Sequence, residues 1–312
     1  MSYRFERDES IPGASRRIAC EQLERALAAL ADPDELGAEE TIHDVRKRCK
    51  KLRGLVRLVR PGLGDEYDHA NAAFRDAARE LSPLRDAHAL QGTFGDLVEA
   101  ESGQQPRGTA AVMRALEEQA ADASRGLREG DERLARAAAL LEGARARIDG
   151  WPLDDDPDVL EAGIAKTYRR ARNAFRASLE APSTATLHEW RKRVKYGWYH
   201  ARLLRDSAPS VLGPLAKRFH DLSGALGDDH DLAVFVEALR EEPDRYGGDV
   251  EAPILLAEAR RSDLRDRAQR LGARLYVEPP GAYAQRLVAY RAAWILHGDE
   301  NAVGEIAALA PD

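Results

Sequence analysis

Two segments of the chain, 145 residues apart, carry the same order of residues. The first is IHDVRKRCKKLRGLVRLVR (42–60), and the second is LHEWRKRVKYGWYHARLLR (187–205). Further along, ELSPLRDAHAL (80–90) is similar to DLSGALGDDHDL (221–232) after a small insertion. Because two elements recur in the same order, we infer that one helical unit has been duplicated.

The segments between Pro- and Gly-containing breakers are typical of helices. Their apolar residues recur every three or four positions, as Leu23, Leu27 and Leu30 do, and none shows the β-branched alternation of strands. The sequence predicts an all-α chain that forms a single domain over residues 1–312. Its first helical repeat covers about 1–150 and its second about 151–312, with the loop GWPLDDDPD (150–158) as the boundary.

On a helix, at about 100° per residue, each repeated segment separates into a basic face and an apolar face. The apolar faces hold Val45, Cys49, Leu52, Val56 and Val59 in the first copy and Trp190, Val194, Ala201 and Leu204 in the second. The basic faces hold His43, Arg46, Lys47, Lys50 and Arg57, and His188, Arg191, Lys192, Lys195 and Arg202. Gly54 lies within the first basic face, and Tyr199 takes its place in the second.

This positive charge is local, because the whole chain has a net charge of −7. Residues 43–60 nevertheless contain eight Lys or Arg against Asp44 alone. A basic face is often only a solvated surface, but like charges three and four residues apart destabilise a helix. The same unfavourable stripe occurs twice, which indicates a ligand with many negative charges.

Two other classes of function are alternatives. The acidic net charge argues against general nucleic-acid coating, although Tyr196, Trp198 and Tyr199 leave RNA binding open as an alternative. A metal-dependent phosphohydrolase could use His43 or the DDHD run at 228–231, but the Lys and Arg around His43 would repel a divalent cation. We expect no enzyme activity, no cofactor and no metal site.

The histidines allow more than one interpretation. His43 and His188 lie near the predicted helix starts, where Thr41 or Thr186 could act in capping. They could donate hydrogen bonds to phosphate or pack as helix-start residues. His88 and His230 lie in acidic, turn-like settings, and there we favour a structural role, in which each fixes a turn between two helices.

Other features indicate a soluble protein. No apolar run approaches the roughly 20 residues needed to span a bilayer, and MSYRFERDES (1–10) shows no secretory signal. Cys20 and Cys49 are too few for a disulfide framework and are expected to be packing residues. We expect a cytoplasmic location.

The paired basic motifs, each followed by LRDAHAL or LGDDHDL, resemble those of the CHAD domain, a histidine-bearing α-helical domain. The resemblance covers nearly the whole chain. It implies two similar antiparallel helical bundles related by a pseudo-two-fold axis, with the basic helices lining a central cleft or pore. It also implies non-catalytic binding of inorganic polyphosphate, and association with polyphosphate granules would be consistent with that ligand.

The resemblance assigns binding roles to the matching positions. These are His43, Arg46, Lys47, Lys50 and Arg57, with His188, Arg191, Lys192, Lys195 and Arg202. Basic turns upstream of each motif add Arg16, Arg17, Lys166, Arg169 and Arg170 as further candidates.

Two features depart from relatives in the family. Trp198 stands where Arg53 does in the first copy, so the second stripe is less basic. Many relatives also carry a triphosphate-tunnel domain marked by an ExExK strand, and YRFERDES (3–10) is not that motif. We therefore expect a stand-alone module.

Overall fold

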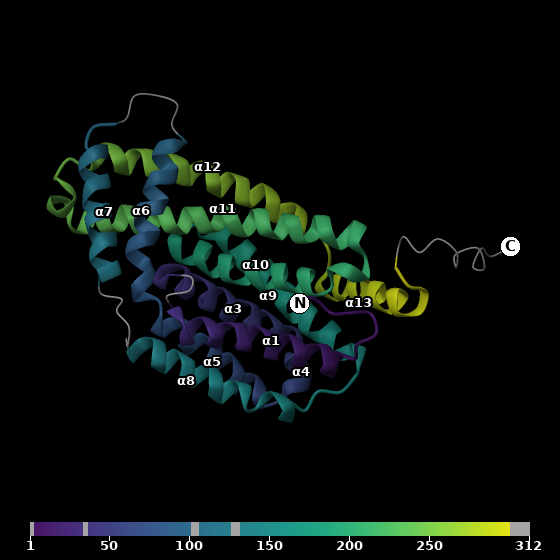
Figure 1. Cartoon of the computed structure of the whole chain (residues 1–312). Helices are drawn as coiled ribbons and strands as arrows, with labels where there is room; N and C mark the ends of the chain where they lie inside the picture. Colours follow the sequence, from purple (N-terminus) through teal and green to yellow (C-terminus); the bar gives the residue numbers. More distant parts are fainter. Residues whose placement is uncertain (1–2, 34–36, 101–105, 126–131, 300–312) are drawn as a thin grey trace.

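The computed structural model describes residues 3–33, 37–100, 106–125 and 132–299, and within these ranges the chain is helical and contains no strand (Figure 1). The prediction of an all-α fold is therefore confirmed. The helices are α1 (Ile11–Ala31), α3 (Ala38–Leu58), α4 (Arg60–Leu63), α5 (Glu66–Glu80), α6 (Pro83–Glu99), α7 (Thr109–Arg125), α8 (Glu132–Arg145), α9 (Pro157–Glu180), α10 (Thr184–Leu203), α11 (Pro209–Glu241), α12 (Glu251–Leu275) and α13 (Pro280–His297). Short 3-10 helices lie at Ile148–Gly150, Arg205–Ser207 and Pro243–Tyr246.

The helices form two packed groups that meet along α3, α9 and α10. Helices α1, α3, α5 and α8 pack on one another, and α9, α10, α11 and α12 form a second series in which α13 covers α9. Helix α3 contacts both α9 and α10. In Figure 1, α11 and α12 run side by side along one edge of the molecule, and α5 and α8 lie along the other.

Helices α6 and α7 pack mainly on each other and on the second group, and α6 also contacts α3. They contact each other, and α6 packs on α11, where the rings of Phe94 and Phe235 stack with centroids 4.8 Å apart. Figure 1 shows both helices standing across α11 and α12. Two helices from the first half of the chain, α6 and α7, therefore contact elements of the second half. A two-fold relation between the halves stays a prediction.

The repeated downstream segment folds differently in its two copies. In the first copy the chain breaks after α5, and Pro83 begins α6. In the second copy Gly224 stands at the place of Pro83, and the helix continues as α11 without interruption. Proline lacks the amide hydrogen that a helix interior needs, whereas glycine keeps it. The expected turn at His230 is therefore wrong, since His230 lies inside α11; His88 lies in α6, and its side chain is outside the described residues.

The apolar faces of the repeated segments are buried, as predicted. The side chains of Val45, Cys49, Leu52 and Val56 in α3, and of Val59 directly after it, are fully buried. In α10 Trp190, Val194 and Ala201 are buried as well, as is Leu204 directly after it. The basic faces thereby point away from these cores.

Helices α3 and α10 approach each other closely at Gly54. A Cβ atom at this position would lie 2.7 Å from Cβ of Tyr199, which is closer than two carbon atoms can pack. Nε2 of the buried His200 also lies 3.1 Å from the carbonyl oxygen of Gly54. Position 54 therefore needs glycine, and this contact fixes the spacing of the two basic helices.

The helix starts correct one expectation. Ser183 caps α10 in a capping box with Thr186, so the capping role expected for Thr186 is confirmed. Thr41 has no such role, because α3 begins at Ala38 and the Thr41 hydroxyl donates to the carbonyl of Pro33 instead.

None of the helices in the described ranges is long and apolar enough to cross a membrane.

Candidate functional site

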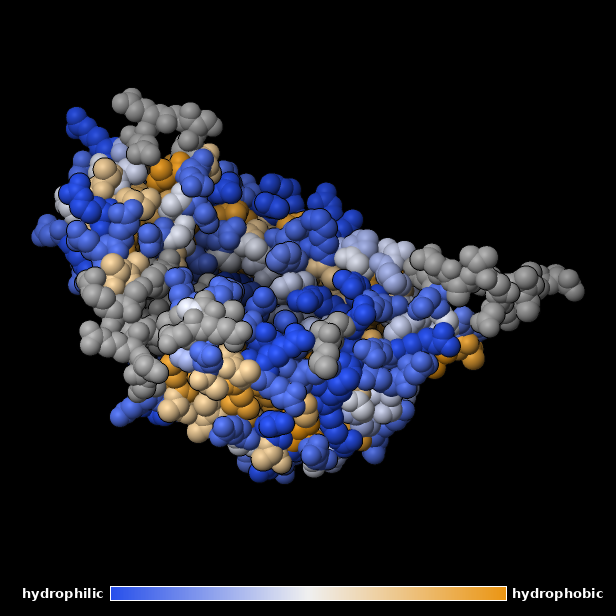
Figure 2. All heavy atoms as spheres, viewed as in Figure 1, coloured by the Kyte–Doolittle hydropathy of each residue, from blue (hydrophilic) through white to orange (hydrophobic). Residues whose placement is uncertain are grey.

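A hollow of about 290 Å³ lies between α3, α10 and α11. We call it the main hollow. Its lining residues are His43, Arg46, Lys47, Lys50, Lys51, Arg191, Lys195, Trp198, Tyr199, Arg202, His220, Ser223, Gly224, Gly227, Asp228 and Asp231. Seven are Lys or Arg and two are Asp, which leaves a formal excess of five positive charges. In Figure 2, hydrophilic residues border a recess between the layer of α11 and that of α1.

Helix α3 supplies one wall of the main hollow with the stripe predicted from its periodicity. His43, Arg46, Lys47 and Lys50 all line it. Arg46 is also held by the end of α5 and the residues after it, because its guanidinium donates to the carbonyl of Ala78 and to the hydroxyl of Ser82. The helical period places Arg48 outside this stripe, and Arg48 pairs instead with Asp44 at 2.5 Å.

Lys51 also lines the main hollow and was not among the predicted residues. Its ammonium group lies 5.5 Å from the ring centroid of Tyr3 and 3.4 Å from Oε1 of Gln22. Burial, followed by the positive charge of Arg202, lowers the pKa of Lys51 to about 8. An anion in the hollow would oppose both effects.

Helix α10 supplies the second wall. Arg191, Lys195 and Arg202 line it as predicted. Arg191 packs on Gly227 of α11, where a Cβ atom would lie 3.4 Å from its Nε. The Arg202 guanidinium lies 5.2 Å from the ring centroid of Trp198, a cation–π distance.

Helix α11 supplies a third wall, and none of its lining residues is among the predicted binding residues. It contributes His220, Ser223, Gly224, Gly227, Asp228 and Asp231. These positions recur three and four residues apart, so they share one helix face. A stripe of small and polar residues at helical spacing over residues 220–231 was the available signal.

The two carboxylates of the main hollow also line a neighbouring hollow. Asp228 and Asp231 are shared with a space that Asp96 of α6 and Arg260 of α12 help to line. Burial and the charge of Asp231 raise the pKa of Asp228. The positive hollow therefore borders a negative one.

Asp229, in the same DDHD run, has a structural role. Its side chain is buried, and its Oδ1 lies 3.2 Å from Nε of Arg261 and 2.9 Å from Nε of Arg265, both on α12. Within the described ranges, no group of three or more His, Cys, Asp or Glu side chains could hold a metal ion.

Arg57 lies in a different, smaller hollow of about 10 Å³ that shares no lining residue with the main hollow. We call it the second hollow. It is lined by Arg57, Arg60, Tyr67, Lys166, Thr167, Arg170, Arg193 and Tyr196. Two of the additional candidates, Lys166 and Arg170, therefore gather around Arg57 and not around Lys50.

His188 and Lys192 do not line the main hollow. The His188 ring packs on that of His230 with centroids 4.2 Å apart. Burial lowers the pKa of His188 to about 4, with His230 and Lys192 contributing in the same direction. Lys192 is exposed and pairs with Glu189 at 2.9 Å.

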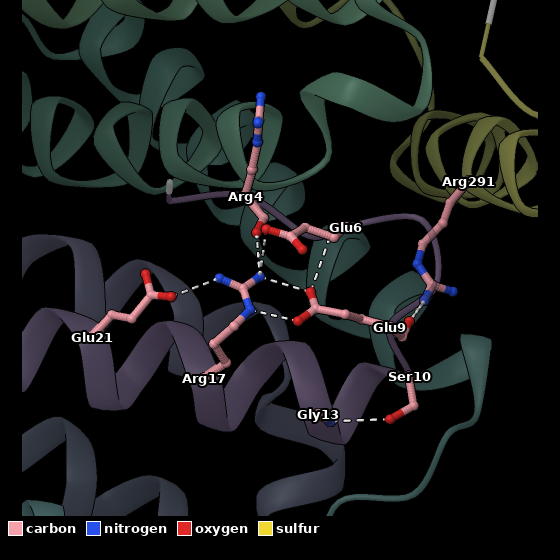
Figure 3. Close-up of polar contacts among 8 residues, drawn as sticks. All are labelled: Arg4, Glu6, Glu9, Ser10, Gly13, Arg17, Glu21 and Arg291. Carbon is pink, nitrogen blue, oxygen red and sulfur yellow. Dashed lines mark hydrogen bonds and ion pairs between the residues drawn. The ribbon is translucent and has the colours of Figure 1, made fainter. Parts of the chain in front are cut away.

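Three further candidates lie outside both hollows. Arg16 donates to the carbonyl of Trp151. Arg17 binds the carboxylates of Glu9 and Glu21 and the carbonyl of Arg4, as Figure 3 shows. Its hydrogen bond lowers the pKa of Glu9. Arg169 is exposed on α9 and lines neither hollow.

The geometry thus brings seven of the ten predicted side chains, four from α3 and three from α10, into one hollow. Among known families, the chain matches the CHAD domain over residues 21–240, which is more than half of its length. No curated protein matches it. The chain belongs to the CHAD domain family.

Proposed function

We propose that the main hollow binds linear inorganic polyphosphate and catalyses no reaction. The observation that carries the proposal is the excess of five positive charges contributed mainly by α3 and α10. The family to which the chain belongs is associated with polyphosphate binding. A cytoplasmic location is part of this proposal.

The size and charge of the main hollow favour a chain of phosphates over a single one. Seven cationic side chains from two helices cannot all reach one tetrahedral group, whereas polyphosphate offers a charge at every unit. Lys and Arg bind phosphate oxygens without a strict geometry, and Arg can bind two at once. The ligand would also relieve the repulsion between neighbouring cations.

Equivalent residues of the two repeats support the predicted pseudo-two-fold cleft. Lys50 and Lys195 occupy matching positions, and both line the main hollow. The ion pair of Asp44 with Arg48 has its counterpart in that of Glu189 with Arg193. We infer that the cleft formed from one duplicated binding helix.

A competition experiment with labelled polyphosphate tests the assignment. The variant Lys50→Glu with Lys195→Glu should weaken binding by about 2 kcal/mol or more, roughly thirtyfold, because two attractive contacts become repulsive. The control Arg176→Glu with Arg218→Glu changes the net charge equally at exposed positions outside the hollow and should stay close to wild type. Equal loss in both variants would show that only overall charge matters.

RNA binding is the competing function, and Trp198 is the residue that favours it. Tyr199 is buried against Gly54, and Tyr196 is buried beneath Arg57, so neither ring is presented for stacking. Trp198 is half-buried and stacks on His220 at 4.8 Å. If RNA were the ligand, alanine at Trp198 would weaken RNA binding far more than polyphosphate binding, and RNA of equal charge would compete as well as polyphosphate at matched ionic strength.

The phosphohydrolase alternative makes an opposite prediction. Under our proposal, the purified protein releases no phosphate from polyphosphate in the presence of Mg²⁺ or Mn²⁺. Release that disappears in a Asp228→Asn or His43→Gln variant would replace the binding proposal with a catalytic one.

A further inference from the structure

Residues 3–10 precede α1 and are fastened to helices of the second half of the chain. We call them the N-terminal strap. The amide of Phe5 donates to the carbonyl of Leu203, the last residue of α10, at 2.9 Å, and the Phe5 side chain is buried. Arg291 of α13 donates to the carbonyl of Glu9 at 3.0 Å (Figure 3). The strap is therefore part of the packed structure.

Tyr3 begins the N-terminal strap and lies beside the main hollow. Its side chain is buried, and its hydroxyl donates to the carbonyl of Lys51 in α3 at 2.7 Å. Its ring meets that of Tyr199, which lines the main hollow, in an edge contact with centroids 5.8 Å apart. Burial raises the pKa of Tyr3 well above its ordinary value, so the phenol keeps the proton that it donates. Tyr3 thus contacts both basic helices.

Two cations of the main hollow lie within cation–π distance of the Tyr3 ring. The ammonium nitrogen of Lys51 is 5.5 Å from the ring centroid, and Cζ of Arg202 is 5.6 Å from it. Arg202 also lies near Trp198 of its own helix, so Tyr3 is the ring that the two cations share. After burial, Arg202 is the main cause of the lowered pKa of Lys51, which means that the two cations repel each other. The negative charge of the ring faces opposes this repulsion.

The two repeats differ in where such a ring comes from. Arg202 matches Arg57, and Lys51 matches Tyr196. Arg57 of α3 stacks on Tyr196 of α10, with its Cζ 4.0 Å from the ring centroid. The matching pair, Arg202 of α10 and Lys51 of α3, contains no ring. Tyr3 therefore provides from outside the repeated segments the ring that Tyr196 provides from within one.

We propose that Tyr3 is a positioning residue of the main hollow, whose ring holds Lys51 and Arg202 together so that both face one ligand. A preorganised pair of cations loses less conformational freedom when an anion binds. The effect on polyphosphate rests on the proposed function, whereas the placement of the two cations is measurable on the protein without a ligand.

Substitutions at position 3 separate the ring from its hydroxyl. Tyr3→Phe keeps the ring and should leave polyphosphate affinity within about twofold of wild type, whereas Tyr3→Leu should weaken it about fivefold, because two cation–π contacts are lost. The matched control Phe5→Leu removes a buried ring of the same strap that does not line the main hollow, and its affinity should also stay within about twofold. Equal losses in Tyr3→Leu and Phe5→Leu would overturn the proposal, because a loosened strap would explain both.

A second background tests whether Tyr3 acts through these two cations. Five other Lys or Arg residues line the main hollow, so binding stays measurable in a Lys51→Met, Arg202→Gln protein. There, Tyr3→Leu should change the remaining affinity less than about twofold, because the groups that the ring positions are gone. A purely structural role would cause the same fold loss in both backgrounds, and that result would contradict the proposal.

NMR of the free protein tests the placement without polyphosphate. A nearby aromatic ring shifts the resonances of methylene protons, so those beside the charged groups of Lys51 and Arg202 should lose this shift in Tyr3→Leu and keep it in Tyr3→Phe. Unchanged resonances in Tyr3→Leu would rule out the positioning role whether or not the hollow binds polyphosphate. A wild-type protein that shows the shifts but binds no polyphosphate would remove the proposed function and leave Tyr3 as the residue that places the two cations.

Discussion

Lys51 lines the main hollow, and the surroundings of its ammonium group disfavour protonation. Its pKa is lowered to about 8, first by burial and then by Arg202 and Arg48. A lysine at its ordinary pKa would stay charged at pH 8. Here about half of the side chains are neutral at that pH.

Polyphosphate binding should therefore be linked to proton uptake. An anion favours the charged form and raises the pKa of Lys51, so binding at pH 8 should take up roughly half a proton, and binding at pH 6 almost none from this residue. Calorimetry in two buffers with different ionisation enthalpies measures the uptake. Lys51→Met should abolish it at pH 8, and uptake that persists in this variant would assign the proton elsewhere.

Asp229 illustrates a buried charge held by its partners. Its carboxylate pairs with Arg261, itself buried, and with Arg265. Asp229→Asn should lower the free energy of unfolding by about 2–4 kcal/mol, because it removes the buried carboxylate that Arg261 and Arg265 share and leaves Arg261 only Glu258 as a counter-charge. Urea denaturation measures the change. Asp263 is exposed on α12, so Asp263→Asn should stay within about 0.5 kcal/mol of wild type, and similar losses in both variants would contradict this role.

At the scale of the elements, the spacing of α3 and α10 depends on one glycine. A methyl group at position 54 would overlap Tyr199, and the His200 contact with the Gly54 carbonyl resists a shift of either helix. This packing sets the distance between the two basic faces, and hence the width of the main hollow.

Gly54→Ala should destabilise the protein by about 1–3 kcal/mol through overpacking, despite the better helix propensity of alanine. Gly143→Ala is the matched control, because Gly143 lies inside α8 with open space around its Cβ position. That substitution should stabilise the chain by up to about 1 kcal/mol. Thermal unfolding compares them, and a stabilising effect of Gly54→Ala would show that α3 and α10 can separate without cost.

At the scale of the whole molecule, a net charge of −7 coexists with the excess positive charge of the main hollow. The acidic residues outside the main hollow confine the positive potential to the hollow, and they disfavour the binding of polyanions to the rest of the surface. Binding should then depend on the charges that reach the hollow and not on the average charge.

Salt should weaken polyphosphate binding steeply. If about six phosphates are neutralised, the slope of log K against log salt should be roughly −4, by analogy with single-stranded nucleic acids. Lys50→Glu with Lys195→Glu should flatten the slope, whereas Arg176→Glu with Arg218→Glu should preserve it. A slope near zero in the wild-type protein would contradict charge pairing as the source of affinity.

Local periodicity determined much of this protein. The burial of Val45 and Cys49, and the placement of Lys47 and Lys50 on the other face of α3, follow from the geometry of one helix. The all-α fold follows from the same spacing. These features needed no knowledge of which helices meet.

Tertiary packing decided the rest, because periodicity orients a side chain but does not select the neighbour that its face meets. Arg57 and Arg202 hold equivalent places in the two repeats, yet Arg57 lines the second hollow and Arg202 the main one. The wall that α11 supplies to the main hollow depends on the close packing of Gly227 on Arg191. His188 belongs to the predicted basic face, but its ring packs on that of His230 and does not line the main hollow. The sequence alone determined the helices and their charged faces, and the contacts between helices determined which charges share a site.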